Sequence, residues 1–384
     1  MKKKLVVIIN DRLSDLITKG EITPRYYNPG EVFDEVHLIA TNDDRPDLAI
    51  LKKTAGRAEL FFYNFPIPKS YILIMDFFPE WVERKILLLL NDINIRKIDP
   101  LLVRCYGSGT NSLLAYCIYQ KWKYSFVVSL HTHPDAFVCG RYEWPLRKMY
   151  SFCLKRMDKR ILSKAAMILP VYSSILDYLE SINLRERSRV LYNVLDAVNI
   201  RLKSDYTLSF PIKILSVGRI VQGKFPLQLV KAISEIPSAE LTIIGDGSWW
   251  KKLKNLVKKL NLEGRVFLIP SLPNNQLVSQ LYQYDLFAVH SDYPEMNKST
   301  MEAMLAGLPI ILNKRRRAAV KELNDATIRL VENTKEGYKG AILALLQDKN
   351  AREEYARAIH SYAVKTFLPE KCEIDYKEVY ESQQ

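Results

Sequence analysis

The sequence predicts an α/β protein built from two doubly wound, Rossmann-like domains, and three observations carry this prediction. Short apolar runs rich in Val, Ile and Leu alternate with helical stretches along the chain. The runs lack polar alternation, which is typical of parallel strands buried on both faces of a sheet. The series is interrupted once, by a polar segment near the middle, so we expect two sheets.

Seven runs before the interruption are expected to be strands: Leu5–Ile9, Val36–Ala40, Leu60–Tyr63, Leu101–Tyr106, Phe126–Leu130, Met167–Val171 and Val190–Tyr192. Six runs after it form the second series: Ile212–Val217, Leu241–Ile244, Val266–Leu268, Leu286–Val289, Ile310–Leu312 and Ile328–Val331. The stretches between them supply the helical crossovers that parallel strands need.

The interruption lies between Asp196 and Pro211, where Asn199–Asp205 is polar and aperiodic. We place the linker there, so that residues 1–198 form an amino-terminal domain and residues 199–368 a carboxyl-terminal one. Two such domains would face each other across a cleft. Ligands of doubly wound sheets bind at the carboxyl ends of the strands, so the chemistry is expected in that cleft.

Composition restricts the class of protein. Of the 384 residues, 48% are hydrophobic and 26% charged, which excludes a disordered chain. No apolar run reaches the roughly 18 residues of a spanning helix, and the segment Met1–Asp11 is interpreted as a first strand, not a signal peptide. Five widely spaced cysteines predict reduced thiols in a cytoplasmic protein. A net charge of +13 predicts an anionic partner.

The carboxyl end of the run Ile212–Val217 carries a candidate phosphate site. Gly218 and Arg219 follow the run directly, and Lys224 comes after four further residues. A glycine lets a ligand approach the backbone closely, and two fixed cations suit a diphosphate. The alternative is a βα turn with two solvated basic residues, and this motif taken alone favours the alternative.

The segment Asp292–Pro309 shifts the balance toward a phosphate site. Asn297 or Ser299 can cap a helix that runs to Ala306, and its N-terminus would offer backbone N–H groups and partial positive charge. Glu302 lies in the first turns, where its carboxylate can accept hydrogen bonds from a ribose diol. In the alternative interpretation, a local Lys or Arg pairs with a buried Glu302.

Together these residues resemble the GT4 family of retaining glycosyltransferases with the GT-B fold. The resemblance rests on the motifs Gly218-Arg219-x4-Lys224, Gly245-Asp246-Gly247 and Glu295…Glu302-Ala303-Met304-x-x-Gly307-x-Pro309. Upstream, Asn193–Asp196 resembles the family's segment before the linker, and Ser129–His133 its segment after the fifth strand. Residues from about 369 to 384 resemble the family's terminal helix, which implies that they pack back on the amino-terminal domain.

The resemblance implies a nucleotide-sugar donor and assigns its contacts. Arg219 and Lys224 would hold the donor's diphosphate, Glu302 its ribose and Glu295 the transferred sugar. The other donor-binding residues are Gly218, Gly245, Ile269 beside the base, Asn297, Lys298, Ser299 and Thr300. The family separates its two glutamates by seven residues, but six separate Glu295 from Glu302. Either the loop absorbs this difference or another group contacts the sugar.

We expect no metal and no other cofactor. The sequence has no Asp-x-Asp motif, with which many transferases hold Mg²⁺. Arg219, Lys224 and the helix N-terminus are therefore the expected substitutes for stabilising the leaving diphosphate. The resemblance further implies retention of anomeric configuration, through front-face attack assisted by the departing phosphate.

The amino-terminal domain is expected to bind the acceptor. His131 follows a predicted strand, close to His133 and Asp135, and the resemblance adds His131 to Arg219, Lys224 and Glu295 as a catalytic residue. A structural histidine or a weakly supported zinc pair is the alternative. Tyr106 and Gly107 resemble an acceptor-side turn, for which a simple helix cap is equally good, and Gly20 would replace a glycine pair common in the family.

Basic residues concentrate between Arg141 and Lys164, where Tyr150, Leu154, Met157 and Ile161 share one helical face. Such a helix can lie on an anionic membrane surface, or it can pack on its domain with a solvated basic face. Lys314–Arg317 is interpreted as a solvated run that could instead touch an anionic substrate.

The leading hypothesis is a retaining transferase that moves sugar from a UDP- or GDP-sugar to a glycan or lipid-linked acceptor in surface polysaccharide synthesis. Its place would be the cytoplasm, peripherally at the inner face of the membrane. The first alternative is a catalytically silent sugar-nucleotide-binding or scaffolding relative, suggested by the glutamate spacing. A nucleic-acid-binding protein is suggested by charge alone, and without a recognisable reader motif we expect no nucleic-acid partner.

Overall fold

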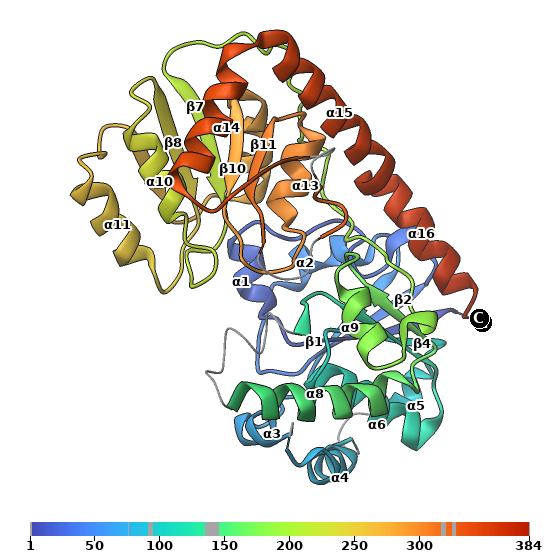
Figure 1. Cartoon of the computed structure of the whole chain (residues 1–384). Helices are drawn as coiled ribbons and strands as arrows, with labels where there is room; N and C mark the ends of the chain where they lie inside the picture. Colours follow the sequence, from blue (N-terminus) through green and yellow to red (C-terminus); the bar gives the residue numbers. More distant parts are fainter. Residues whose placement is uncertain are drawn as a thin grey trace. The chain divides into compact units, whose positions relative to one another are not determined.

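The computed structural model describes residues 2–75, 77–90, 95–134, 146–315, 320–324 and 328–383 (Figure 1). The chain divides into two compact units. Unit 1 comprises Met1–Val194 and Cys372–Gln384, and unit 2 comprises Leu195–Lys371. Each unit contains one parallel six-stranded sheet with helices between its strands. The predicted fold class, α/β with two doubly wound sheets, is confirmed.

In unit 1 the strand order is β3-β2-β1-β4-β5-β6. The strands are β1 (Lys4–Ile9), β2 (Glu35–Ala40), β3 (Glu59–Asn64), β4 (Leu102–Tyr106), β5 (Phe126–Leu130) and β6 (Met167–Pro170). The helices are α1 (Leu13–Thr18), α2 (Leu48–Leu51), α3 (Lys69–Ile74), α4 (Pro79–Leu89), α5 (Ile95–Ile98), α6 (Thr110–Trp122), α8 (Leu146–Leu162), α9 (Ile175–Ser181) and α16 (Pro369–Glu381). Three 3₁₀ turns lie at Pro29–Glu31, Lys52–Ala55 and Arg185–Arg187.

One predicted strand of this unit is wrong. Val190–Tyr192 runs beside β6, where the Leu191 N–H donates to the Pro170 carbonyl at 2.9 Å and the Arg189 N–H to the Ile168 carbonyl at 3.0 Å. These bonds amount to an isolated bridge and do not continue as a ladder. The apolar run is explained by packing of Leu191 into the core, which is a signal that a buried loop shares with a strand.

In unit 2 the order is β12-β11-β10-β7-β8-β9. The strands are β7 (Ile212–Val217), β8 (Ala239–Ile244), β9 (Val266–Ile269), β10 (Leu286–Val289), β11 (Ile310–Asn313) and β12 (Arg329–Val331). The helices are α10 (Leu227–Ser234), α11 (Trp250–Lys259), α12 (Asn274–Gln280), α13 (Lys298–Leu305), α14 (Lys335–Gln347) and α15 (Lys349–Phe367), with a 3₁₀ turn at Leu281–Gln283. All predicted runs of the second series form strands.

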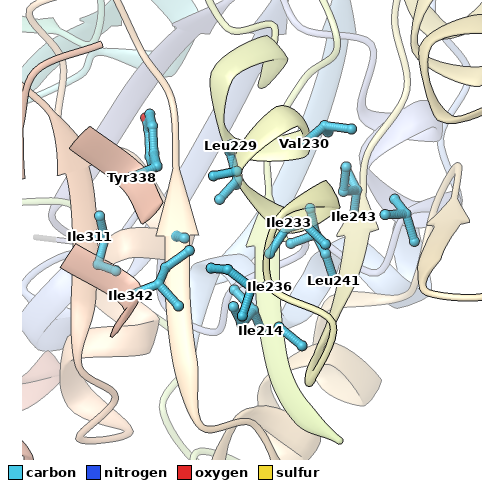
Figure 2. Close-up of a cluster of buried hydrophobic side chains, with 14 of the residues drawn as sticks. Ile214, Leu229, Val230, Ile233, Ile236, Leu241, Ile243, Ile311, Tyr338 and Ile342 are labelled. Carbon is cyan, nitrogen blue, oxygen red and sulfur yellow. The ribbon is translucent and has the colours of Figure 1, made fainter. Parts of the chain in front are cut away.

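The core of unit 2 forms where helix faces meet the sheet (Figure 2). Leu229 and Ile233, four residues apart on α10, lie one turn above the other and pack with Leu241 of β8 and Ile342 of α14. Complete burial of each such side chain stabilises the fold by roughly 1.5–3 kcal/mol. The buried Tyr338 ring keeps its hydroxyl satisfied, because it donates to the Val289 carbonyl at 2.9 Å.

The carboxyl-terminal helix α16 is part of unit 1 and is held there by Arg104, which projects from β4. This arginine is 2% exposed. Its Nε donates to the Ser129 hydroxyl at 2.9 Å, and its Nη1 donates to the Tyr380 hydroxyl of α16. The guanidinium also lies 4.5 Å from the ring centre of Tyr376. Among the described residues no carboxylate pairs with Arg104. Its positive charge is instead stabilised by aromatic rings and by the hydroxyl groups that accept its hydrogen bonds.

Both sheets have the strand order of a dinucleotide-binding fold, in which the chain reverses direction beside the first strand. The reversal falls between β1 and β4 in unit 1, and between β7 and β10 in unit 2. Loops that leave the carboxyl ends of two such strands diverge, and the space between them is where ligands of these folds bind. The fold therefore points to one candidate site in each unit.

Candidate active site

In unit 2 the loops after β7 and β10 meet at the reversal point. They bring together Gly218, Lys224, His290 and Asn297, which line a small pocket of about 20 Å³. The predicted glycine, a predicted cation and the start of α13 thus lie around one point. Arg219 is exposed beside Gly218 and makes no hydrogen bond or ion pair with the described residues.

The loop after β8 explains why the motif Gly245-Asp246-Gly247 belongs to this site. Gly245 has φ +142°, and a Cβ at this position would lie 2.0 Å from the Gly218 carbonyl oxygen. Next to this contact, the Ile220 N–H donates to the Asp246 carbonyl at 2.9 Å. A Cβ on Gly218 itself would meet nothing within 4 Å. Gly245 therefore fixes the β7 loop, while the space in front of Gly218 stays open.

Two residues that the resemblance assigns to different parts of the donor form an ion pair with each other. The ammonium of Lys224 pairs with the carboxylate of Glu295, and both side chains are less than one-fifth exposed. The Ser291 hydroxyl donates to Glu295 Oε1 at 3.3 Å, and Arg315 Nη2 donates to the Glu295 carbonyl at 2.8 Å. The shorter glutamate spacing thus still places Glu295 beside Lys224.

Glu302, on α13, is 2% exposed and its charge is met locally. Asn274 Nδ2 donates to Glu302 Oε1 at 3.0 Å, and Lys298 Nζ lies 3.7 Å from the same oxygen. Lys298 Nζ also donates to Asn274 Oδ1 at 3.3 Å. A local Lys partner for Glu302 was expected from the sequence as the alternative. Asn274, which begins α12 and lies 28 residues before Glu302, was not expected.

The start of α13 is tied to the end of β7. The Ser299 hydroxyl donates to the Val217 carbonyl at 3.2 Å. Asn297 is the N-cap residue, and its side chain makes no capping hydrogen bond to the helix. The backbone N–H groups of Thr300 and Met301 donate to the Asn297 carbonyl. The N–H groups of the turn before Thr300 are therefore the ones a bound anion could use.

Two further predicted donor residues lie inside the unit's framework. Thr300 is buried. The Ile269 carbonyl, at the end of β9, accepts the Gly245 N–H at 2.9 Å. Ile269 thus holds the loop after β8, and the side chain of Thr300 is buried in the unit.

His290 is a site residue that the sequence analysis missed. It follows β10 directly, its side chain is 7% exposed, and it lines the pocket with Lys224 and Asn297. Its Nε2 lies 3.5 Å from Asp292 Oδ2, and its buried Nδ1 has no hydrogen-bond partner among the described residues. Its place after a strand at the reversal point was the available signal.

Unit 1 holds a larger pocket of about 410 Å³, lined by residues after β1, β4 and β5. Three of the predicted acceptor-binding residues line it together: Tyr106, Gly107 and His131. His133 does not: it is buried, and its N–H donates to the Tyr172 hydroxyl at 3.0 Å. Gly20, just after α1, does not line the pocket either. Asp135 lies outside the described residues.

His131 is neutral at physiological pH. Burial, and next to it the positive charge of Arg104, lowers the pKa of its ring to about 3. The ring stacks on Tyr106 with centres 5.0 Å apart, and its buried Nε2 has no hydrogen-bond partner among the described residues. A neutral imidazole nitrogen in a pocket can accept or donate a single hydrogen bond, depending on its tautomer.

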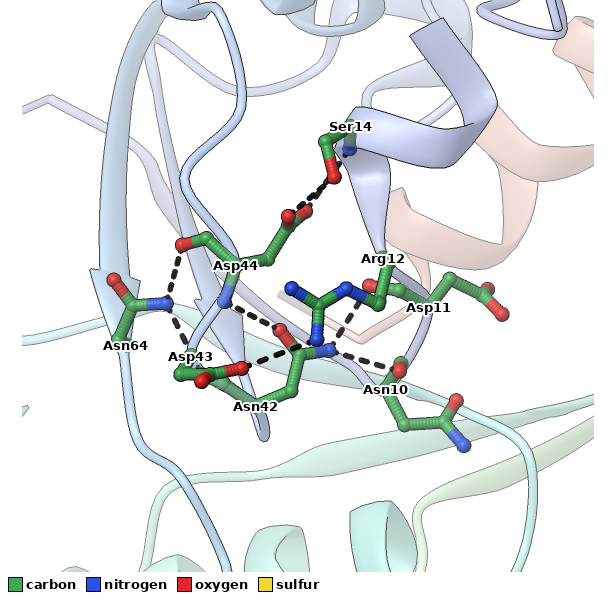
Figure 3. Close-up of polar contacts among 8 residues, drawn as sticks. All are labelled: Asn10, Asp11, Arg12, Ser14, Asn42, Asp43, Asp44 and Asn64. Atoms are coloured by element: carbon green, nitrogen blue, oxygen red, sulfur yellow. Dashed lines mark hydrogen bonds and ion pairs between the residues drawn. The ribbon is translucent and has the colours of Figure 1, made fainter. Parts of the chain in front are cut away.

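The loop after β1 is the polar wall of this pocket, and a hydrogen-bond network fixes its shape (Figure 3). Asn42 Nδ2 donates to the carbonyls of Asn10 and Asp11 at 2.9 and 3.2 Å. Asp44 accepts from the N–H of Ser14 at 3.0 Å and thereby caps α1. Burial alone would raise the pKa of Asp44, but the hydrogen bonds from Ser14 and nearby backbone lower it.

Asp11 was not among the predicted site residues. It lines the pocket, and desolvation by the pocket walls, together with Glu21, raises the pKa of its carboxyl group. A carboxylate and an unpartnered imidazole on one pocket are suited to sugar hydroxyl groups. In the described ranges no three His, Cys, Asp or Glu side chains gather as they would around a metal ion.

Comparison with known proteins agrees with the geometry. Residues 207–362 match the family model described as glycosyl transferases group 1. Over 199 residues the chain is 27% identical to N-acetylgalactosamine-N,N'-diacetylbacillosaminyl-diphospho-undecaprenol 4-alpha-N-acetylgalactosaminyltransferase of Campylobacter jejuni, a match that covers 50% of this chain and 54% of that protein. It is 30% identical over 158 residues to the O-antigen biosynthesis glycosyltransferase WbnH of Escherichia coli, covering 40% and 44%. The chain thus spans about half the length of these curated relatives.

Solved structures resemble the whole chain. Sucrose-phosphate synthase from Thermosynechococcus elongatus superposes with a TM-score of 0.73 at 15% identity, covering 99% of both chains. HepE of Anabaena, in complex with UDP and glucose, gives 0.72 at 14% identity, covering 100% of both. At this identity the likeness establishes the fold.

The strand order and the solved structures together define the class of fold: the GT-B fold, which glycosyltransferases have. More narrowly, the part of the chain from residue 207 to residue 362 is similar to the glycosyl transferases group 1. The resemblance that the motifs predicted is confirmed at this level.

Proposed function

We propose that this protein transfers a sugar from a UDP- or GDP-sugar to a glycan or lipid-linked acceptor in surface polysaccharide synthesis. The family supports a nucleotide-sugar donor. The names of two relatives support the acceptor class, since one acts on a diphospho-undecaprenol-linked saccharide and the other in O-antigen biosynthesis. The proposal includes retention of anomeric configuration and catalysis without a metal ion.

The observation that carries the proposal is the convergence of anion-binding groups on one loop junction of unit 2. Lys224, the open backbone at Gly218 and Asn297, the N-cap residue of α13, line the same small pocket, and the exposed Arg219 directly follows Gly218. Charge-assisted hydrogen bonds from guanidinium and ammonium groups to phosphate are about twice as strong as neutral ones. The buried carboxylate of Glu302, oriented by Asn274, is the matching acceptor for a ribose diol.

The ion pair of Lys224 with Glu295 gives the site a way to respond to its donor. In the free protein each charge neutralises the other. A diphosphate is the stronger partner for Lys224 because it carries more negative charge, so its binding releases the Glu295 carboxylate. Glu295 then becomes available to hydroxyl groups of the sugar, next to the phosphate, as the resemblance implies.

The chemistry needs stabilisation of the leaving group. The acceptor oxygen forms a bond to the anomeric carbon as the bond from that carbon to the phosphate oxygen breaks. The hydroxyl proton passes to the departing phosphate. Arg219, Lys224 and the α13 amides stabilise the charge that builds on the phosphate oxygens, and one preorganised donor of this kind contributes about 3 kcal/mol to lowering the barrier.

The acceptor is assigned to the pocket of unit 1. Its volume of about 410 Å³ is sufficient for a sugar ring, since ligand pockets start near 300 Å³. Tyr106 and His131 line the pocket with aromatic rings, and Asn10, Asp11 and Asn111 line it with polar side chains. Neutral His131 accepts or donates a hydrogen bond to an acceptor hydroxyl without adding charge to the pocket.

The test is release of nucleoside diphosphate from a panel of nucleotide sugars, with and without excess EDTA. Arg219→Ala should lower the rate at least about 100-fold, and Glu302→Gln should weaken donor binding roughly tenfold or more. Lys213→Ala removes a solvent-facing charge from β7 and should leave both unchanged. Full activity of Arg219→Ala, or loss of activity in EDTA, would contradict the assigned roles.

A catalytically silent sugar-nucleotide-binding subunit is the second candidate. The closed Lys224–Glu295 pair and the shorter glutamate spacing favour it. Tight binding of a nucleotide sugar, with no release of diphosphate on any acceptor tried, would support it. Analysis of the product's anomeric configuration by NMR then tests retention for an active protein.

A further inference from the structure

Exposed apolar side chains gather on three helices of unit 1. Of the sixteen large apolar side chains that are exposed in the described part of the chain, seven lie on or between α3, α4 and α8. They are Leu73, Phe77, Phe78, Trp81, Leu88, Met149 and Phe152. Single exposed apolar residues are ordinary, but a contiguous group marks a surface that binds something apolar.

On α4 the exposed residues follow helical spacing. Phe78, Trp81 and Leu88 are 61%, 44% and 65% exposed, and they recur every three and seven residues. Val82 and Ile86 of the same helix are fully buried and attach it to the unit. The helix therefore has a second apolar stripe that the core does not use.

The outward face of α8 is not the apolar face that the sequence suggested could lie on a membrane surface. Tyr150, Leu154, Met157 and Ile161 are buried in unit 1, so that apolar face is occupied by the protein itself. The exposed positions of the opposite side are Lys148, Met149, Phe152, Arg156 and Lys159. Two apolar residues and three cations thus share the exposed side of the helix. Residues 141–145 of the predicted basic stretch lie outside the described residues.

The three helices form one surface at one end of unit 1 (Figure 1). The ring of Phe77, just before α4, contacts Tyr150 of α8 with centres 4.9 Å apart. Arg160 of α8 pairs with Glu80 of α4 at 2.9 Å, and the ring of Tyr71 on α3 contacts Trp81 of α4. The exposed side chains are therefore held on elements that are fixed to one another.

The charge of this surface is positive. Arg84, Arg156 and Lys159 are exposed, and the ammonium of Lys85 lies 5.4 Å from the ring centre of Trp81. The described acidic side chains of these helices are engaged in contacts within unit 1, and the cations outnumber them. Glu80 and Glu83 pair with Arg160, and buried Asp158 accepts the Tyr178 hydroxyl at 2.6 Å. An anionic partner is thereby favoured.

We propose that the surface formed by α3, α4 and α8 docks on an anionic lipid bilayer, with its aromatic residues at headgroup depth. Trp and Phe with interspersed Lys and Arg are the side chains that favour a membrane–water interface. The lysine-rich helix α11 of unit 2 provides the contrast, because it has no exposed large apolar side chain and fits a solvated face.

Docking by this surface also bears on the acceptor. Ile72 and Met75, at α3, and Leu154 of α8 line the pocket of unit 1. The helices that would touch lipid are therefore also a wall of that pocket. If the proposed function holds, a saccharide can enter the pocket while its lipid anchor stays in the bilayer, which narrows the acceptor class to lipid-linked saccharides.

Vesicle sedimentation tests the docking without donor or acceptor, so its outcome is independent of the proposed transfer reaction. Full-length protein is mixed with vesicles of phosphatidylglycerol and phosphatidylcholine, or of phosphatidylcholine alone. We expect binding to the anionic vesicles only. Each cation near the surface contributes ~1 kcal/mol, so the charge reversals Arg156→Glu and Lys159→Glu together should weaken binding at least about 30-fold.

A second variant tests the apolar part. Trp81→Ser combined with Phe152→Ser should reduce binding at least roughly tenfold. The tryptophan emission of the wild type should shift to the blue on anionic vesicles, and this shift should be smaller in the single variant Trp81→Ser. The matched control for the charge reversals is Lys258→Glu with Lys259→Glu on α11. The matched control for the apolar variant is Phe210→Ser, since the Phe210 side chain is 76% exposed in unit 2. Thermal melts show whether each variant is folded. No vesicle binding by the wild type, or equal loss in variants and controls, overturns the proposal, as does self-association through this surface in place of lipid binding.

Discussion

Two single-methyl substitutions at neighbouring glycines should separate the framework of the donor site from its ligand surface. Gly245→Ala places a Cβ 2.0 Å from the Gly218 carbonyl oxygen, at a backbone φ of +142° that side chains rarely adopt. Gly218→Ala places its Cβ in open space. The first change should destabilise unit 2, and the second should weaken donor binding while the fold is kept.

The magnitudes follow from the geometry. An ordinary contact at Cβ is near 3.4 Å, so Gly245→Ala forces the β7 loop to move by more than 1 Å. Overpacking of this kind costs about 1–3 kcal/mol, and the strained backbone costs a similar amount. A total of about 3 kcal/mol corresponds to a fall in Tm of roughly 6–12 °C for a unit of this size. Gly218→Ala should change stability by less than about 0.5 kcal/mol.

The assay combines thermal unfolding by circular dichroism with titration of UDP and GDP. Gly218→Ala should melt like the wild type and bind the preferred diphosphate roughly tenfold more weakly, because the methyl group occupies the approach to the backbone. Gly264→Ala, where a Cβ would also meet nothing within 4 Å, is the control for both measurements. The reasoning is refuted if Gly245→Ala melts like the wild type, or if Gly218→Ala binds diphosphate normally.

Three further predictions concern unit 1. Asp44→Asn should cost about 1–2 kcal/mol at pH 7. Because hydrogen bonds lower the pKa of Asp44, this stabilisation is complete above the ordinary pKa near 4 and fades as pH falls through the lowered pKa, so the difference from the wild type in urea unfolding should be smaller at pH 3 than at pH 7. In the wild type, the folded protein resists protonation of the His131 ring, so the free energy of unfolding should fall by about 1.4 kcal/mol per pH unit as pH falls from 6.5 toward 3. His131→Asn should remove this pH dependence. Identical slopes for the two proteins between pH 4 and 7 would contradict this. Arg104→Met should leave the hydroxyls of Tyr380 and Ser129 without their donor and cost roughly 2–4 kcal/mol, and hydrogen exchange should show α16 opening first, whereas unchanged protection of α16 would count against the anchor.

The fold was predictable because burial of parallel strands leaves a direct trace in the sequence. Leu5 to Ile8 of β1 are fully buried on both faces, and the apolar run there has no alternation. The same signal failed at Val190–Tyr192, since burial of Leu191 in a loop produces an apolar run without a ladder. Periodicity reports burial and does not by itself report hydrogen-bond pairing.

The site could be predicted for residues whose place follows from their position directly after a strand or at the start of a helix. Gly218 and Lys224 follow β7, and α13 follows β10, which pairs with β7 in the sheet, so their meeting follows from topology. Asn274 could not be found in this way, because its contact with Glu302 joins two helices 28 residues apart. The closed pair of Lys224 with Glu295 was equally hidden, since spacing alone does not show that one loop residue turns toward another.

Helix α8 shows a further reason why the sequence did not predict the exposed surface of unit 1. Helical spacing identified its apolar face correctly, and that face is buried. Whether an apolar face meets protein or lipid depends on what the rest of the chain brings to it. The exposed positions Phe152 and Arg156 stand out once the neighbouring helices are known.

The attachment of α16 means that unit 1 is not a continuous piece of the gene product. A fragment ending at Val194 would lack the final thirteen residues, and with them the rings and hydroxyl that enclose the Arg104 guanidinium. Anyone expressing this half alone would need to graft the terminal segment back, for instance by fusing it ahead of the first strand or supplying it as a peptide. Added peptide restoring a defined melting transition to such a fragment would turn this architectural detail into a practical split-protein reporter.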